Sequence, residues 1–80
     1  MNKKNSRKNH YLDIYEIGEK IRLERLKRKI KQNVLAKQAG ISNTYLSDIE
    51  HQRTLPSLTT YIRLCEALNI DFGYILNQNN

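Results

Sequence analysis

Apolar residues recur at intervals of three to five along most of the chain, with polar and charged residues between them. This spacing predicts amphipathic helices, because residues three or four positions apart share one face of an α-helix. No stretch alternates apolar and polar residues for long enough to predict a strand. The first such segment runs from about Leu12 to Lys29, and its apolar positions are Leu12, Ile14, Ile17, Ile21 and Leu26. Gly18 inside it indicates either a weaker helix or close packing.

Shorter helical segments follow: Gln32 to Ala39, Asn43 to about His51, Pro56 to Leu68, and a last short helix with Phe72, Ile75 and Leu76. Ser42 and Asp71 are expected to be N-caps, and Asn69 ends the third of these helices. The residues expected to point inward are Leu35, Ala36, Ala39, Ile41, Leu46, Ile49, Leu58, Ile62, Leu64, Cys65 and Leu68. The sequence therefore predicts one small all-α domain with about five helices.

The stretch QNVLAKQAGISNTYLSDIE, residues 32–50, is helical in pattern on both sides of Gly40. A glycine inside a helix costs about 1 kcal/mol relative to alanine, but one just past a helix end adopts left-handed backbone readily. Two helices joined by so short a turn cross at a large angle, which requires a small residue such as Ala36 at the crossing. The remaining positions that this helix crossing constrains also hold small or apolar residues. Residues 32–51 therefore predict a helix-turn-helix motif.

The second helix of this motif is expected to present a polar outer face. Its inward side is set by Leu46, Ile49 and Glu50. At about 100° per residue, the opposite side holds Thr44, Ser47, Asp48 and His51, with Asn43 at the N-terminal tip. Small polar side chains suit a helix that enters the DNA major groove, about 12 Å wide. A face that is merely solvated more often carries long Lys and Glu side chains, so the pattern favours the groove interpretation.

Charge is distributed unevenly along the chain. Residues 1–40 carry twelve Lys and Arg against four Asp and Glu, whereas residues 41–80 carry two against four. A basic front half indicates a polyanionic partner, although such residues can also serve only to keep a small protein soluble. Residues 1–11 are expected to form a flexible basic arm, which either wraps DNA or is idle. Residues 12–77 form the predicted domain and residues 78–80 a polar tail.

Several other classes of protein are disfavoured. The single cysteine, Cys65, cannot form an internal disulfide and suits a reducing cytosol. No apolar run approaches the roughly 18 residues that span a bilayer, and the N-terminus lacks the apolar segment of a signal peptide. His10 and His51 have no cysteine or acidic partner at metal-ligand spacing. We expect a cytoplasmic protein without membrane segment, metal, cofactor or enzymatic activity.

The segments IGEKIRLERLKRKIKQNVLAKQAGISNTYLSDIEHQRTLPSL, CEALNI and DFGYIL resemble the phage-repressor-like helix-turn-helix domain of the Cro/Xre type. The resemblance covers roughly residues 17–76. It implies a compact five-helix, lambda-repressor-like fold and transcription regulation through sequence-specific binding to double-stranded DNA. It also implies, as is usual in the family, a homodimer on a palindromic operator.

The resemblance also implies roles for individual residues. Base-reading positions are Asn43, Thr44, Ser47 and Asp48, and phosphate-binding positions are Lys31, Gln32, Tyr45, Arg53 and Thr54. Arg25 and Glu50 match a buried ion pair; an unpaired Glu50 on the apolar side of its helix would cost several kcal/mol. The chain departs from the family twice: Lys31 replaces a capping Ser or Thr, and Gln52 replaces a glycine.

Specificity is expected to arise without an arginine on the groove face. Asn43 suits adenine, the Thr44 methyl suits thymine, and Asp48 suits the N4 amine of cytosine. The last helix is the expected dimer surface, through Tyr74 and Ile75, although Phe72 and Leu76 equally suit closure of the monomer core. An antitoxin or adaptor that mainly binds a partner protein stays open as an alternative, as does a restriction–modification controller. Repression and activation are not distinguished.

Overall fold

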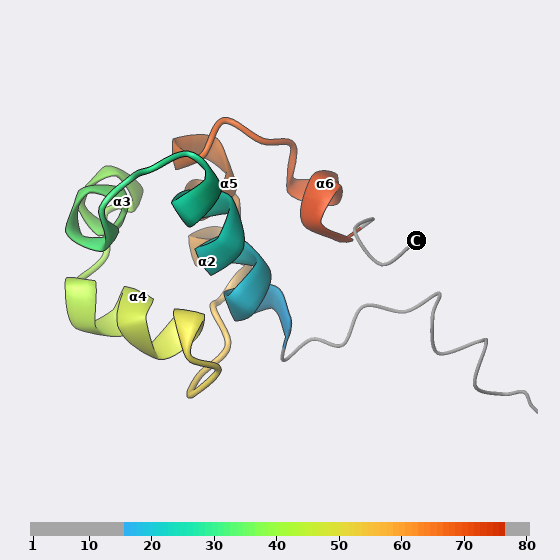
Figure 1. Ribbon diagram of the computed structural model, residues 1–80. Coiled ribbons are helices and arrows are strands. Elements are labelled where there is room, and N and C mark those ends of the chain that lie inside the picture. The colour runs from blue at the N-terminus through green and yellow to red at the C-terminus, as the bar shows by residue number, and fades with distance from the viewer. Residues whose placement is uncertain (1–15, 77–80) are drawn as a thin grey trace, which may run out of the picture.

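The computed structural model describes residues 16–76 of the 80-residue chain (Figure 1). In this range the chain forms helices and no strand: α2 (Ile17–Lys27), α3 (Gln32–Ala39), α4 (Asn43–Glu50), α5 (Leu58–Ala67) and α6 (Phe72–Leu76). The predicted all-α, five-helix fold is confirmed. The predicted basic arm, the polar tail, and the positions Leu12 and Ile14 lie outside the described residues.

Polar side chains define where several helices begin. The backbone N–H of Tyr45 donates to Ser42 Oγ at 3.0 Å, which confirms Ser42 as the N-cap of α4. The backbone N–H of Thr60 donates to Ser57 Oγ at 3.1 Å, so α5 begins at Leu58 and not at Pro56 as predicted. At the start of α6, the Gly73 N–H donates to Asp71 Oδ2 at 3.0 Å. These caps satisfy amides that have no partner inside the helix.

The core forms where α3 packs against α4 and α5, and where α2 packs against α4 and α6. Its buried apolar members are Ile21, Leu35, Ala36, Ala39, Leu46, Ile49, Tyr61, Leu64, Cys65, Leu68 and Ile75. Leu58, which was predicted to point inward, is instead 72% exposed, and Leu26, an apolar position of the first predicted helix, is 45% exposed. Leu26 is turned away from the buried positions Ile21 and Arg25 of α2, and Leu58 is the first residue of α5.

Gly18 marks the closest approach of α2 to α4. A Cβ atom added at this buried glycine would lie 1.7 Å from the carbonyl oxygen of Ile49 and 2.7 Å from its carbonyl carbon. Real carbon and oxygen atoms do not approach so closely, so only glycine allows this backbone contact. Of the two interpretations of Gly18, the structure supports close packing.

Left-handed backbone turns the chain at several helix ends. Gly40 ends α3 with φ of 73°, and the following Ile41 N–H donates to the carbonyl of Ala36 at 3.0 Å. Gln52, which follows α4, also has positive φ, 59°. A non-glycine residue there costs about 1–2 kcal/mol. The turn after α4 therefore keeps a conformation that favours glycine although the glycine is absent.

Candidate nucleic-acid interface

The outer face of α4 is open to solvent along its length. In Figure 1, α4 lies along the lower edge of the molecule, beneath α3. Asn43, Thr44 and His51 are exposed, and Ser47 and Asp48 are partly exposed. The residues of the opposite face, Leu46, Ile49 and Glu50, are buried. The helix is therefore anchored on one side and presents small polar groups on the other.

A buried ion pair holds the C-terminal end of α4 against α2. Arg25 Nε donates to Glu50 Oε2 at 2.7 Å, and Arg25 Nη2 donates to Glu50 Oε1 at 3.0 Å. Arg25 Nη1 also donates to the carbonyl of Ile30 at 2.8 Å. Paired, bidentate hydrogen bonds between charged groups are both strong and directional. The position of α4 is thus set from inside the domain.

Gln32 adds a third group to this ion pair. Its side-chain Nε2 donates to Glu50 Oε1 at 3.1 Å, so the first residue of α3 is joined to the last residue of α4. The sequence assigned Gln32 only to a phosphate and did not predict this contact. Lys31, which precedes it, is exposed and makes no capping hydrogen bond. The backbone amides at the start of α3 consequently lack a side-chain cap and are available to an anion.

Arg53 folds back onto the outer face of α4. Its backbone N–H donates to the carbonyl of Asp48 at 2.8 Å, and its Nε donates to Asp48 Oδ1 at 2.9 Å. Its Nη2 lies 3.5 Å from Ser47 Oγ. On the same side, His51 Nδ1 lies 2.8 Å from the carbonyl oxygen of Ser47. An arginine therefore does lie on the outer face of α4, contrary to expectation, because the turn at Gln52 brings Arg53 back beside the helix.

The remaining predicted residues are divided between surface and core. Thr54 is exposed, and the half-buried Tyr45 packs against the core. Tyr74 is exposed and Phe72 is more so, so Phe72 does not close the core. Ile75 is fully buried, at 0% exposure. Its assignment to a dimer interface is wrong, because its side chain fills the core of its own subunit.

A second group of ion pairs forms around Glu24 of α2, which contacts Lys27 of the same helix and Arg28 just after it. Burial raises the pKa of Glu24, but the hydrogen bonds from Arg28 and Lys27 outweigh it and hold that pKa below its ordinary value. Spacings of three and four residues could have revealed this cluster in the sequence. These contacts pair the charges of Glu24 with those of Lys27 and Arg28 on the surface of α2 and the turn that follows it.

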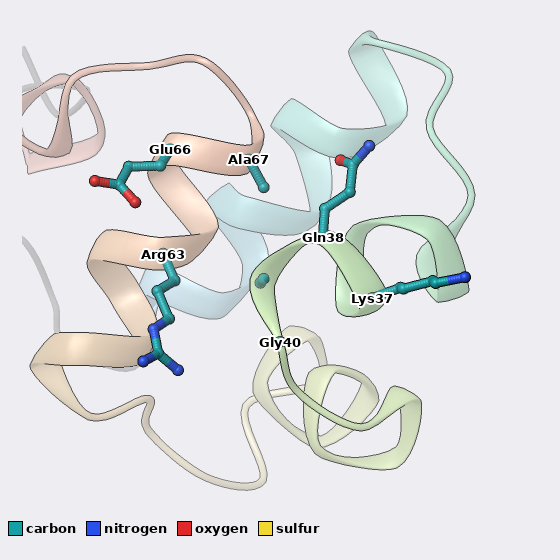
Figure 2. Close-up of a pocket in the computed structure, with 7 residues that line it drawn as sticks. Lys37, Gln38, Gly40, Arg63, Glu66 and Ala67 are labelled. Carbon is teal, nitrogen blue, oxygen red and sulfur yellow. The ribbon is translucent and has the colours of Figure 1, made fainter.

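Figure 2 shows a surface hollow between α3 and α5. Its polar lining residues include Lys37, Gln38, Arg63 and Glu66. The ends of these side chains point in different directions and do not converge on one point. Within residues 16–76, no group of three or more His, Cys, Asp and Glu side chains is placed to hold a metal ion, and no helix is long and apolar enough to cross a membrane. The outer face of α4 remains the best-defined candidate site.

Comparison with known proteins gives consistent matches. A helix-turn-helix family profile matches residues 21–75. The ImmF control region 10 kDa protein of Bacillus phage phi105 is 41% identical over 64 residues, which are 80% of this chain and 71% of that protein. The immunity repressor protein of the same phage is 39% identical over 62 residues, or 78% of this chain. This chain spans only 43% of the length of that repressor.

A solved structure is similar as well. The P22 c2 repressor protein, crystallised in complex with a synthetic operator, has a TM-score of 0.69 and 38% sequence identity. The match covers 76% of this chain and 92% of that one.

Proposed function

Because this chain belongs to the helix-turn-helix family of DNA-binding transcription regulators, we propose that α4 enters the major groove of an operator and reads its bases. The family consists of regulators and not of enzymes, so the chain has no catalytic role to assign. The observation that carries the proposal is the contrast between the two sides of α4. Its inner side is buried and joined to α2 and α3, and its outer side presents exposed Asn43 and Thr44 at the N-terminal end.

Asn43 is the base-reading residue with the clearest chemistry. Its amide can donate to N7 and accept from N6 of adenine, a pairing with two hydrogen bonds that the neighbouring Thr44 cannot make. The Thr44 methyl, next to it, suits the methyl group of thymine. Both residues are exposed, so they need no rearrangement to meet a groove.

Affinity would come mainly from the phosphates. The absence of a side-chain cap at the start of α3 and the exposure of Lys31 support one phosphate contact there. Thr54 and Tyr45 remain predicted phosphate contacts from the family resemblance. Since each cation that meets a phosphate releases counterions, binding should weaken steeply as salt concentration rises.

The test compares Asn43→Ala with Gln38→Ala, a matched control that removes an exposed carboxamide of α3. The operator is first obtained by selecting bound duplexes from a random pool. We expect Asn43→Ala to weaken binding to this operator by about 1–3 kcal/mol and to change binding to random DNA little. Gln38→Ala should change neither. Equal losses on both DNAs for Asn43→Ala would remove the base-reading role.

We further propose a homodimer on a palindromic operator, because one recognition helix covers only a few base pairs. The supporting observation is that Tyr74 in α6 is exposed and so is available to a second chain. Sedimentation equilibrium of the chain with the selected operator should give two chains per duplex. The selected sequence itself should contain two half-sites with centres about 34 Å apart. An antitoxin or adaptor role would instead require a stable complex with another protein. The proposed binding to DNA also supports a cytoplasmic location.

A further inference from the structure

Arg53 is held on the outer face of α4 by contacts to two residues of that helix. Its backbone N–H and its Nε both donate to Asp48, at 2.8 and 2.9 Å, and its Nη2 lies 3.5 Å from Ser47 Oγ. We propose that Arg53 reads a guanine in the major groove and that Asp48 is the positioning residue that aims it. This inference rests on the proposed entry of α4 into the groove. It differs from the roles that the family resemblance implies, which are base reading for Asp48 and phosphate binding for Arg53.

The contacts to Asp48 and Ser47 use the Nε N–H and at most one of the two N–H groups of Nη2, so the remaining N–H groups of the guanidinium can still donate to a base. Asp48 occupies Nε, so the terminal edge formed by Nη1 and Nη2 points away from the carboxylate. That edge offers two parallel N–H donors, which match the O6 and N7 acceptors of guanine in the commonest specific contact between proteins and DNA. The Arg53 side chain is 58% exposed and that of Asp48 39%, so the edge is open to a base.

Pairing with Asp48 makes Arg53 poorly suited to act only as a phosphate contact. The carboxylate at 2.9 Å offsets the positive charge that would displace counterions. Asp48 alone would repel phosphates, and the pair removes that repulsion. An arginine held in one rotamer also loses less conformational freedom when it binds a base. Both effects favour a directed contact over a diffuse electrostatic one.

Arg53 also differs in position from the other arginine in the C-terminal half of the chain. Residues 41–80 contain two basic residues, Arg53 and Arg63. Figure 2 shows Arg63 on α5, beside the hollow near Gly40. Of these two arginines, Arg53 is the one that contacts the outer face of α4, through Asp48.

The alternative, in which Asp48 accepts from the N4 amine of cytosine, would select the same G·C pair. Replacement of each selected guanine by 7-deazaguanine separates the two, because it removes the N7 acceptor and leaves cytosine unchanged. We expect one 7-deazaguanine position to weaken binding of the full chain by about three- to tenfold. Arg53→Ala should abolish this sensitivity, and Arg63→Ala, the matched control, should keep it.

Asp48→Asn provides the test of positioning. It keeps the charge and length of Arg53 but loses the carboxylate that holds Nε, so the preference for guanine at that position should fall several-fold. The slope of binding against salt should not decrease. If Arg53→Ala instead weakens all duplexes equally and lowers the salt slope by about one, Arg53 is a phosphate contact and the inference is overturned.

These outcomes are separable from failure of the proposed function. A chain that selects no sequence overturns both proposals. A chain whose adenine preference depends on Asn43, but whose binding is insensitive to 7-deazaguanine at every position, overturns only the role of Arg53. Loss of the guanine preference in Arg53→Ala, with the adenine preference intact, supports both.

Discussion

The two carboxylates of α4 have the same chemistry in opposite surroundings. Glu50 is 2% exposed and accepts two hydrogen bonds from the guanidinium of Arg25, which is 25 residues away in the sequence. Asp48, two residues earlier, is partly exposed and receives one Nε contact from Arg53, which is five residues away. Each acid pairs with an arginine from another segment. The two pairs differ in their exposure to solvent.

This difference separates stability from recognition within one helix. A buried charge pair cannot lose one partner cheaply, since the remaining charge has no water to solvate it. An exposed pair is screened and contributes little, but it can hold a side chain in one orientation. The inner pair therefore fixes the position of the helix, and the outer pair orients side chains on the surface that we propose to meet DNA.

Glu50→Gln is expected to have the largest effect on folding. The substitution keeps the shape of the side chain but leaves the Arg25 guanidinium buried without a counter-charge. The free energy of unfolding should fall by about 3–5 kcal/mol, measured by urea denaturation followed by far-UV circular dichroism. In a domain of this size such a loss leaves little stability.

The double variant Arg25→Met with Glu50→Leu supplies the control for this prediction. It removes both charges and fills their space with apolar side chains, a replacement that is often neutral or stabilising in other proteins. It should be more stable than Glu50→Gln alone. If the double variant were the less stable of the two, the unpaired charge would not be the source of the loss.

Gly18→Ala should have the next largest effect, because it disturbs the backbone contact beside the inner pair. The added Cβ would meet the Ile49 carbonyl oxygen at 1.7 Å, so α2 and α4 must separate. Overpacking of this kind costs about 1–3 kcal/mol. Gly73→Ala is the control, since its Cβ would meet only the exposed Asp71 carboxylate, at 3.0 Å. Comparable losses in both variants would mean that helix separation is not involved.

Most of the fold could be predicted from apolar spacing and caps. The bounds of α3 match the predicted helix from Gln32 to Ala39, because Gly40 gives an unambiguous end. The start of α5 was misplaced because Pro56 and Ser57 are both good helix-start residues, and only the capping hydrogen bond decides between them. Ile75 was assigned to a surface because a five-residue helix is too short for periodicity to identify its buried side.

The candidate site was predicted less completely. The outer residues of α4 follow from the helical period, and an acid on the inward side requires a partner. The contact between Arg53 and Asp48 could not be predicted, since it depends on the left-handed turn at Gln52, where the sequence lacks the usual glycine. The contact from Gln32 depends on how α3 and α4 cross, which residue spacing does not specify.

Asp48→Asn is expected to have the smallest effect on folding and gives the sharpest contrast with Glu50→Gln. Both substitutions change one carboxylate of the same helix to its amide, but Asp48 is partly exposed, and exposed pairs contribute about 0.2–1 kcal/mol. The backbone contact from Arg53 to the Asp48 carbonyl does not involve the side chain, so the turn should persist. The urea midpoint should therefore shift only slightly, while the guanine preference of the bound DNA falls. A loss of stability approaching that of Glu50→Gln would instead mean that both faces of α4 support the fold, and the division between an anchoring face and a reading face would have to be abandoned.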